Sequence, residues 1–492
     1  MYYISTRGGS EKKTSARVIK QGLAEDGGLF VPESIPTVSK DFIKKLAEED
    51  YAHRAADVLS LYLTDYTYDE LLSAATDAYK EESFGKYAAP VKSLDKTHKV
   101  LELWHGPTCA FKDMALQIMP RLLSTALKKT GEKRTALILV ATSGDTGKAA
   151  LEGYKDVDGV KIMVFYPEDG VSDIQKLQMA SQEGENVNVC AIKGNFDDAQ
   201  TGVKQIFSDT NIAKELDEKG YFLSSANSIN WGRLAPQIVY YFSAYCDLMN
   251  AGDITLGDEI DICVPTGNFG NIFAAYLAKK MGLPVRRFIC ASNVNNVLTD
   301  FINTGIYDRN RQFHTTISPS MDILISSNLE RLLWLIQGEE KTAECMKLLK
   351  ETGKYEVSAE VREKIASEFI GCFASDDETK QTIAETFEKH SYLIDTHTAV
   401  ALFAAKKNAT DIPVVTASTA SPYKFAADVL SALTGNRDNG NDFFRILREL
   451  NAKTGAAVPR PLAALENKTL RFTTSVGKSK DEMFAEVAKF AD

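Results

Sequence analysis

The middle of the chain alternates between short apolar runs and segments with helical periodicity. The run Leu137-Ile138-Leu139-Val140 is continuously apolar, which is typical of a strand buried on both faces of a parallel sheet, and it predicts a strand at 134–142. An alanine-rich helical pattern follows from Lys148. Similar runs predict further strands at 160–166, 187–192, 221–225, 260–264, 287–291 and 412–417. Because strands that alternate with helices form βαβ units, we predict a mostly parallel α/β fold whose strand-end loops gather along one edge.

The flanking segments have different patterns, which predict a division into domains. Residues 1–95 begin with a segment punctuated by glycine and proline and continue with helical patterns from Lys40, so we interpret them as a small, mainly helical N-terminal domain. Residues 96–319 form the predicted α/β core. Residues 320–394 are predicted to be a helical insertion, and residues 395–492 to return to the core and to end in helices.

Composition narrows the class of protein. The formal net charge of −10 argues against a nucleic-acid-binding protein, and the longest apolar runs are too short to cross a membrane. Seven scattered cysteines without a Cys-x-x-Cys pair and six dispersed histidines predict neither a disulfide framework nor a metal site. Together with an N-terminus that lacks the layout of a signal peptide, the cysteines favour the cytoplasm.

Lys112 is the first candidate for chemistry. It ends the segment Trp-His-Gly-Pro-Thr-Cys-Ala-Phe-Lys at 104–112, where Phe111 and Met114 provide apolar neighbours. Partial burial lowers the pKa of a lysine, so its amine can act as a nucleophile near neutral pH. A solvated lysine at the start of a helix is the ordinary alternative for such a residue taken alone. His105 and Cys109 lie nearby, and packing in the core is the simpler interpretation of both.

Four loops rich in small and polar residues are the next candidates. Gly267-Asn268-Phe269-Gly270-Asn271 follows a predicted strand and can present backbone amides to a phosphate at the start of a helix. The loop 143–147 can bind a carboxylate or a second phosphate in the same way. The segment 224–233 combines hydroxyls, amides and Arg233, which suits a phosphorylated zwitterion, and the segment 416–422 can offer a hydroxyl to a ring nitrogen. Each loop taken alone is also explained as an ordinary capped turn.

An amine nucleophile combined with a phosphate cradle suits one cofactor in particular, pyridoxal 5′-phosphate, which carries both an aldehyde and a phosphate. Nucleotide sites find less support. The loop at 142–149 fails the pattern of a nucleoside-triphosphate loop, because Thr142 and Ala149 stand where glycine and serine or threonine are required. The Gly-x-Gly-x-x-Gly pattern of dinucleotide sites does not follow any predicted strand.

Taken in order along the chain, these motifs resemble the threonine synthase family, in its longer subgroup with an N-terminal domain. That family belongs to the fold-type II pyridoxal-phosphate enzymes, which include the tryptophan synthase β-subunit. The resemblance spans nearly the whole chain and rests on motifs at 3–8, 22–32, 105–108, 111–113, 141–147, 227–233, 267–271 and 419–425.

The resemblance implies two open, mostly parallel α/β lobes with a small helical N-terminal domain. It implies the conversion of O-phospho-L-homoserine and water to L-threonine and phosphate. Lys112 would be the catalytic lysine that bonds the cofactor aldehyde. The implied cofactor residues are Lys112, Gly267, Asn268, Phe269, Gly270, Asn271 and Thr419, with Thr419 at the ring nitrogen. The implied substrate residues are Ser143, Thr146, Asn227, Ser228, Asn230 and Arg233.

The resemblance leaves some features open. Ser421 stands where many relatives have histidine, so the hydrogen bonding around Thr419 is not fixed by analogy. A monomer or a weak homodimer is expected, with no nucleic acid or membrane as partner. Two other functions compete with the implied one. A threonine or serine dehydratase would act on unphosphorylated amino acids and would not need the cluster at 227–233. A silent paralogue that only binds a ligand would have no use for Lys112.

Overall fold

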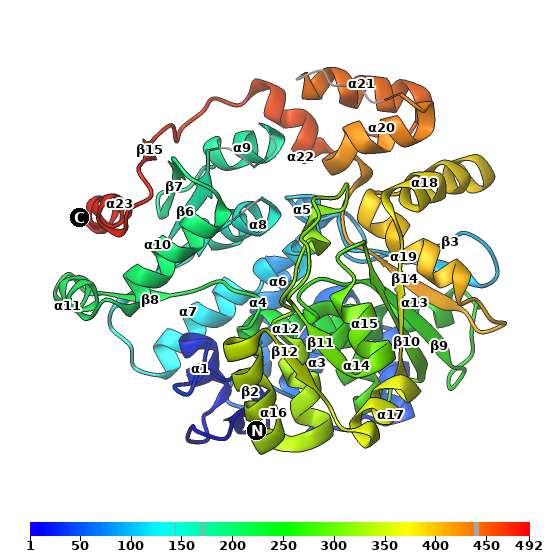
Figure 1. Ribbon diagram of the computed structural model, residues 1–492, viewed down its shortest axis with the longest axis horizontal. Coiled ribbons are helices and arrows are strands. Elements are labelled where there is room, and N and C mark those ends of the chain that lie inside the picture. The colour runs from blue at the N-terminus through cyan, green and yellow to red at the C-terminus, as the bar shows by residue number, and fades with distance from the viewer. Residues whose placement is uncertain (143, 169–170, 172, 437–441) are drawn as a thin grey trace.

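Two parallel sheets form the cores of two lobes (Figure 1). The computed structural model describes residues 1–142, 144–168, 171, 173–436 and 442–492. The larger lobe holds a six-stranded sheet in the order β13-β10-β9-β14-β4-β3, and the smaller lobe a five-stranded sheet in the order β15-β7-β6-β5-β8. All neighbouring strands in both sheets are parallel except β3 and β4.

The strands of the larger sheet are β3 (Val91–Ser93), β4 (His98–Glu102), β9 (Ile260–Pro265), β10 (Val285–Ser292), β13 (Phe369–Phe373) and β14 (Val414–Ser418). Those of the smaller sheet are β5 (Thr135–Ala141), β6 (Val160–Pro167), β7 (Val187–Ile192), β8 (Tyr221–Ser224) and β15 (Ser475–Val476). The seven strands predicted from the apolar runs correspond to β5, β6, β7, β8, β9, β10 and β14, so these predictions are confirmed.

The burial of β5 explains why its sequence is apolar from Ala136 to Ala141. Leu137 and Leu139 pack in a core with α10 (Phe196–Ser208), α11 (Thr210–Glu218) and α23 (Lys480–Ala491). Ala136 and Ile138, on the opposite face, belong to the main core with α7 (Met119–Lys129) and α8 (Asp145–Tyr154). A strand covered by helices on both faces has no solvent side, so it shows no polar alternation.

The N-terminal segment shares the main core with the larger lobe. It contains the antiparallel pair β1 (Tyr3–Ser5) and β2 (Phe30–Pro32) and the helices α1 (Ser15–Gln21), α2 (Lys40–Ala47), α3 (Tyr51–Ser60), α4 (Tyr68–Ala78) and α5 (Glu81–Phe84). The helical pattern predicted from Lys40 matches the start of α2. Buried side chains of this segment form one continuous core with α13 (Pro236–Asn250) and α14 (Gly270–Met281).

The predicted helical insertion is only partly helical. Residues 320–394 contain α16 (Leu329–Thr352), α17 (Ala359–Glu368) and α18 (Asp376–His390), but also β12 (Lys354–Glu356) and β13. β12 pairs with β11 (Ile306–Asp308), and β13 pairs in parallel with β10 at the edge of the larger sheet. Helices make up most of this segment, and the strand β13 could not be predicted within it because β13 directly follows α17 without a turn signal. The domain limits themselves stay a prediction.

The chain after β14 crosses from one lobe to the other. It forms η2 (Pro422–Phe425), α20 (Ala426–Thr434), α21 (Phe443–Thr454), α22 (Arg460–Ala463) and η3 (Ala464–Asn467). It then runs to the smaller lobe, where β15 pairs with β7 and α23 packs on α10 (Figure 1). The remaining elements are α6 (Asp113–Leu116), α9 (Asp173–Ala180), α12 (Trp231–Leu234), α15 (Val297–Thr304), η1 (Pro319–Met321) and α19 (Thr396–Lys407).

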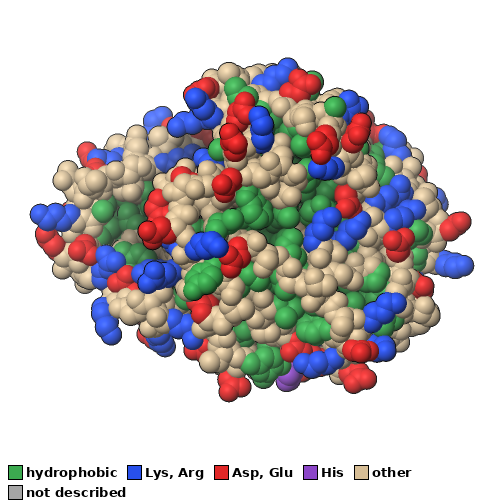
Figure 2. Space-filling model, turned by 90° about the horizontal axis from the view of Figure 1, so that it is seen from below, with side chains coloured by type: hydrophobic (Ala, Val, Ile, Leu, Met, Phe, Trp, Pro, Cys, Tyr) green, Lys and Arg blue, Asp and Glu red, His purple; other side chains and the backbone are tan. Residues whose placement is uncertain are grey.

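The surface carries charge of both signs. On the face drawn in Figure 2, basic and acidic side chains are interspersed between small hydrophobic groups. In the described part of the chain, no helix combines the length and the apolar character needed to cross a lipid bilayer.

A close helix contact connects the two lobes at Gly153 of α8. A Cβ at this position would overlap the backbone carbonyl oxygen of Leu116 in α6. We therefore expect Gly153→Ala to destabilise the protein by about 1–3 kcal/mol, although alanine is normally the better helix residue. Thermal unfolding would measure the loss.

Gly202 in α10 offers a matched control, since a Cβ there would meet the flexible side chain of Met483. We expect Gly202→Ala to cost clearly less. Equal losses in the two variants would mean that the contact between α8 and α6 is not rigid.

Candidate active site

The loops that follow β4 and β14 lie side by side and bring Lys112 close to Thr419. These strands are parallel neighbours, so their carboxyl ends meet at one edge of the sheet. Beyond the strands, the Phe111 amide donates to the Thr419 carbonyl at 2.8 Å, and the Ser421 amide donates to the Cys109 carbonyl at 3.0 Å. The structure thus joins two predicted site residues that lie about 300 positions apart in the chain.

The amine of Lys112 lies in a partly buried, electrostatically crowded place. Its Nζ is 5.0 Å from the centre of the Phe111 ring and makes no hydrogen bond or ion pair with any residue that the structure describes. Burial lowers the pKa of Lys112 to about 8; the Asp145 carboxylate opposes this shift, and the Arg233 guanidinium adds to it. With a pKa of about 8, roughly a fifth of this amine is neutral at pH 7.4, and that form can act as a nucleophile or base.

A buried ion pair that the sequence analysis did not select lies beside Lys112. Lys424 Nζ contacts Asp145 Oδ1 at 2.8 Å and also donates to the Thr108 carbonyl at 3.2 Å and to Gln178 Oε1 at 2.9 Å. Burial alone would raise the pKa of Asp145, but the Lys424 and Lys112 ammonium groups hold it well below its usual range. The pair connects the first turn of α8 in the smaller lobe to η2 and to the Lys112 loop.

The loop 267–271 has the form of an anion cradle between β9 and α14. Within the described residues, none of the backbone amides of 267–272 donates a hydrogen bond. Two carbonyls of the loop instead accept hydrogen bonds from the segment before α16. The Ser326 hydroxyl donates to the Gly267 carbonyl at 2.8 Å, and Asn328 Nδ2 donates to the Asn268 carbonyl at 2.9 Å. A row of amides without acceptors fits a bound phosphate.

Three residues fix the shape of this cradle. Phe269 is buried and has a φ of 61°, in the left-handed region. Gly267 packs so closely on η1 that a Cβ would lie 2.8 Å from the Ser320 carbonyl oxygen. Asn271 accepts a hydrogen bond from the Tyr241 hydroxyl, while its buried Nδ2 has no partner among the described residues. That orphan donor also points to an acceptor supplied by a ligand.

Thr419 and Ser421 have separate roles. The Thr419 hydroxyl has no hydrogen-bond partner in the described part of the chain and lies next to the Lys112 loop, so it remains available to a ring nitrogen. Ser421 is fully buried, and its Oγ accepts from the Tyr423 amide at 3.3 Å. Ser421 thus caps η2.

The predicted substrate residues at 143–146 are only partly visible. Ser143 lies outside the described residues. Thr146 has a half-buried side chain in the first turn of α8, and the turn before it is shaped by Thr142 Oγ1, which accepts from the amides of Gly144 at 3.1 Å and Gly147 at 3.0 Å. The start of this ten-residue helix favours an anion.

Arg233 is a buried cation beside the site. Its Nη1 donates to the Ala226 carbonyl at 2.9 Å, and no carboxylate in the described part of the chain pairs with it. Burial lowers the pKa of Arg233 to about 10, so it still carries its charge at neutral pH. In the same loop, Ser228 Oγ donates to Oδ1 of the exposed Asn227 at 3.3 Å. A buried guanidinium without a carboxylate partner is suited to bind an external anion.

Asn230 differs from its prediction as a substrate residue. Its Oδ1 accepts from the Gly232 amide at 2.9 Å, and its Nδ2 donates to the Ile19 carbonyl at 2.9 Å. Both polar ends of the side chain are thus used to cap α12 and to hold α1. Asn230 therefore acts as a helix cap, which is the alternative that the sequence left open.

Arg331 of α16 connects the N-terminal segment to the predicted substrate loop, residues 225–230. This fully buried side chain donates to the Phe30 carbonyl at 3.0 Å, to the Ile229 carbonyl at 2.6 Å and to Asn328 Oδ1. Since Asn328 also binds the carbonyl of Asn268, one guanidinium connects β2, the substrate loop and the phosphate cradle. No local motif indicates this role of Arg331, because its partners lie far apart in the chain.

Comparison with known proteins places these features in a family. Residues 2–79 match the family described as threonine synthase N terminus, residues 100–416 the pyridoxal-phosphate dependent enzymes, and residues 398–483 the family described as threonine synthase, C-terminal. The cofactor of the family is thus the one whose phosphate the cradle fits.

Individual relatives agree with these matches. Threonine synthase-like 1 from Homo sapiens is 42% identical over 88% of this chain, which spans 60% of that relative's length. Threonine synthase from Pseudomonas aeruginosa is 40% identical over 88% of this chain and 91% of its own. The structure of pyridoxal-phosphate-bound threonine synthase from Brucella melitensis superposes with a TM-score of 0.89 at 36% identity, covering 100% of this chain and 99% of that one. From its first strand to its last helix, this chain therefore belongs to the threonine synthase family of fold-type II pyridoxal-phosphate enzymes.

Proposed function

We propose that this chain converts O-phospho-L-homoserine and water to L-threonine and phosphate with pyridoxal 5′-phosphate as cofactor. The observation that carries the proposal is Arg233, a buried guanidinium beside Lys112 that has no carboxylate partner in the described part of the chain. The cradle at 267–271 supplies one anion site for the cofactor, and Arg233 supplies a second one for a phosphorylated substrate.

The second anion site also separates this proposal from a dehydratase. An enzyme that acts on threonine or serine binds one carboxylate and has no substrate phosphate to neutralise. The start of α8 is suited to that carboxylate, which leaves the charge of Arg233 without a function in a dehydratase. A phosphate on the substrate side chain accounts for it.

In the proposed complex, Lys112 bonds the cofactor aldehyde, the amides of 267–271 hold the cofactor phosphate, and the Thr419 hydroxyl faces the ring nitrogen. The substrate contacts Thr146 and Ser143 with its carboxylate, and Arg233, Ser228 and Asn227 with its phosphate. Asp145 and Lys424 do not bind the substrate. Their ion pair keeps the Asp145 carboxylate, neutralised by Lys424, next to Lys112. It also fixes α8 against the Lys112 loop.

The chain's own residues then supply most of the chemistry. When bound, the cofactor withdraws electrons from the substrate carbon next to the amine. The Lys112 amine, set free where the substrate amine takes its place, would remove the proton from Cα and later carry protons to Cβ and Cγ. Arg233 neutralises the phosphate that leaves from Cγ, and water adds at Cβ. Thr419 would place a hydroxyl at the ring nitrogen, whereas a carboxylate there would stabilise the protonated form of that nitrogen. A largely unprotonated ring would withdraw electrons less strongly, which disfavours transamination.

The cellular setting is also a proposal. All seven cysteines are free and buried, which suits a reducing compartment, and we propose the cytoplasm. A monomer or a weak homodimer stays a prediction.

Simultaneous assay of inorganic phosphate and threonine tests the function. With the cofactor and O-phospho-L-homoserine, we expect equal release of both products by the wild type. Lys112→Ala should lower turnover by about 10³-fold or more, because it removes the base. Formation of 2-oxobutanoate from threonine, without phosphate release, would contradict the proposal and indicate a dehydratase.

The substrate phosphate is tested at Arg233. We expect Arg233→Ala to raise KM for O-phospho-L-homoserine roughly tenfold to a hundredfold, because a charge-assisted contact is lost, with a smaller change in kcat. Steady-state kinetics and competition by inorganic phosphate measure the effect. Arg309→Ala, at a residue outside the site, serves as control. An unchanged KM in the Arg233 variant would remove the basis for a phosphorylated substrate.

The pH dependence of cofactor capture reports the state of Lys112. Only the neutral amine can attack the aldehyde, and the pKa of Lys112 is lowered to about 8. In the protein freed of cofactor, the rate of capture should therefore rise with pH up to about 8 and level off above it. Stopped-flow absorbance measures this rate. A rate that keeps rising through pH 10, as expected for a lysine of ordinary pKa, would show that the amine is solvated.

A further inference from the structure

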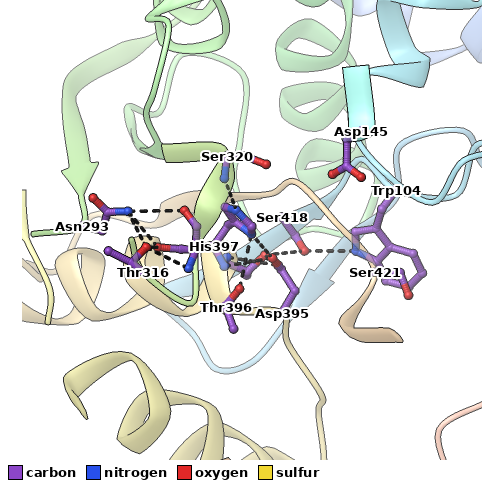
Figure 3. A network of polar contacts seen from close by, with 12 residues as sticks. Trp104, Asp145, Asn293, Thr316, Ser320, Asp395, Thr396, His397, Ser418 and Ser421 are labelled. Atoms are coloured by element: carbon purple, nitrogen blue, oxygen red, sulfur yellow. Dashed lines mark hydrogen bonds and ion pairs between the residues drawn. The ribbon is translucent and has the colours of Figure 1, made fainter. Parts of the chain in front are cut away.

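A buried carboxylate outside the proposed catalytic residues connects both ends of the cofactor site. Asp395 precedes α19 and is completely buried (Figure 3). Its Oδ2 accepts from His397 N at 2.9 Å and from His397 Nδ1 at 2.8 Å. Its Oδ1 accepts from Thr398 N at 3.1 Å and from the Thr398 hydroxyl. The sequence analysis did not select any of these three residues.

On one side, the network reaches the phosphate cradle. Since Nδ1 of His397 donates to Asp395, the Nε2 atom carries a lone pair, and it accepts the Ser320 amide at 3.1 Å. Ser320 lies in η1, and its carbonyl oxygen faces Gly267 so closely that only glycine fits there. Asp395 therefore fixes the ring of His397, His397 fixes η1, and η1 forms the wall behind the cradle.

A second contact holds η1 from the other direction. Asn293, just after β10, donates from Nδ2 to Thr316 Oγ1 at 2.9 Å and to Asp322 Oδ1 at 2.8 Å (Figure 3). The segment between Thr316 and Asp322 is thus tied to β10 on one side and to α19 on the other. This leaves η1 little freedom to move relative to Gly267.

In the opposite direction, the network reaches the ring-nitrogen end. The hydroxyl oxygens of Thr398 and Ser418 are hydrogen-bonded at 2.9 Å, and Trp104 Nε1 donates to Ser418 Oγ at 3.0 Å (Figure 3). Ser418 is the last residue of β14 and directly precedes Thr419. The position of the Thr419 hydroxyl therefore depends on contacts that end at the same carboxylate.

We infer that Asp395 is a positioning residue that, through His397 and Thr398, holds the phosphate cradle and the ring-nitrogen hydroxyl at a fixed separation. A buried carboxylate with this many donors adds little net stability compared with apolar packing, so its contribution lies in fixing geometry. The inference rests on the proposed assignment of 267–271 to the cofactor phosphate and of Thr419 to the ring nitrogen.

The contacts that lead from Asp395 through His397 and Ser320 to the cradle, called here the phosphate arm, are tested at His397 by two variants. His397→Leu leaves the buried Ser320 amide without an acceptor, and we expect it to weaken cofactor affinity by about tenfold or more. His397→Gln can place a carbonyl oxygen near the position of Nε2 and should stay within about threefold of the wild type. Affinity is measured by titrating pyridoxal 5′-phosphate into cofactor-free protein, and phosphorus NMR of the bound cofactor reports the environment of its phosphate.

Asp395→Asn tests the same arm with almost no change in shape. In either orientation the new amide group faces an N–H of His397 or of Thr398, so one donor opposes another. If the amide faces His397, the imidazole must place its proton on Nε2, against the Ser320 amide. We expect this variant to lose cofactor affinity as His397→Leu does, which keeps the test valid if the leucine variant does not fold.

The contacts that lead from Asp395 through Thr398 and Ser418 to Thr419, called here the ring-nitrogen arm, are tested at Thr398. Thr398→Val removes the hydroxyl that joins Asp395 to Ser418, and we expect the absorbance band of the bound cofactor to shift or to change its pH dependence. Thr382→Val is the matched control, because it removes a buried hydrogen bond to the Glu378 carbonyl within α18, away from both arms. It should leave affinity, phosphorus resonance and absorbance unchanged.

The outcomes separate this inference from the assignment on which it rests. If Gly267→Ala, which pushes directly on the cradle, does not weaken cofactor affinity, the phosphate assignment itself fails. If Gly267→Ala weakens it but His397→Leu and Asp395→Asn behave like Thr382→Val, the positioning role is overturned. A response in the phosphate arm with unchanged absorbance in Thr398→Val would overturn the claim that one carboxylate controls both ends.

Discussion

The backbone hydrogen bonds between the Lys112 loop and the Thr419 loop are the constraint on which the rest of the site depends. β4 and β14 are parallel neighbours in the sheet, and beyond the strand ends the Phe111–Thr419 and Ser421–Cys109 bonds form a separate antiparallel bridge between Ala110 and Ala420. The loops that carry Lys112 and Thr419 are thereby held together by main-chain hydrogen bonds, which are stiffer than side-chain packing. The cradle at 267–271 follows β9, the other neighbour of β14, so three adjacent strands place the proposed cofactor contacts along one edge.

The N-terminal segment is part of this construction. Glu330, next to Arg331 in α16, accepts the Thr6 hydroxyl at 2.6 Å and a bidentate pair of bonds from Arg7, each 2.9 Å long. Arg331 itself binds the Phe30 carbonyl, and Asn230 binds that of Ile19. Each contact leads from the first 30 residues to the predicted substrate loop or to α16. Burial of so many charged and polar groups is costly unless each is paired, which ties the geometry of the site to the integrity of the N-terminal fold.

The parts of the fold and site that could be predicted from the sequence are those encoded locally. Strands such as β5 were predictable because burial on both faces leaves an uninterrupted apolar run. Lys112 and the 267–271 loop could be proposed because they occur together with other motifs in a fixed order along the chain, although each has an ordinary explanation when taken alone. β15 has two residues and β13 no turn signal, so neither could be found. Asp145, His397 and Lys424 could not be selected either, since their roles depend on partners brought close only by the tertiary fold.

The pairing of β15 with β7 has a consequence for the order in which the protein can fold during synthesis. β5, β6, β7 and β8 are complete once residue 224 has been made, but the outer edge of β7 stays open until residues 475–476 emerge, and the hydrophobic face of α10 stays uncovered until α23 follows. About half of the chain is translated in this interval, at roughly 5–20 residues per second. During that time the ribosome carries a nascent lobe with an unpaired apolar strand edge, the kind of surface that chaperones bind.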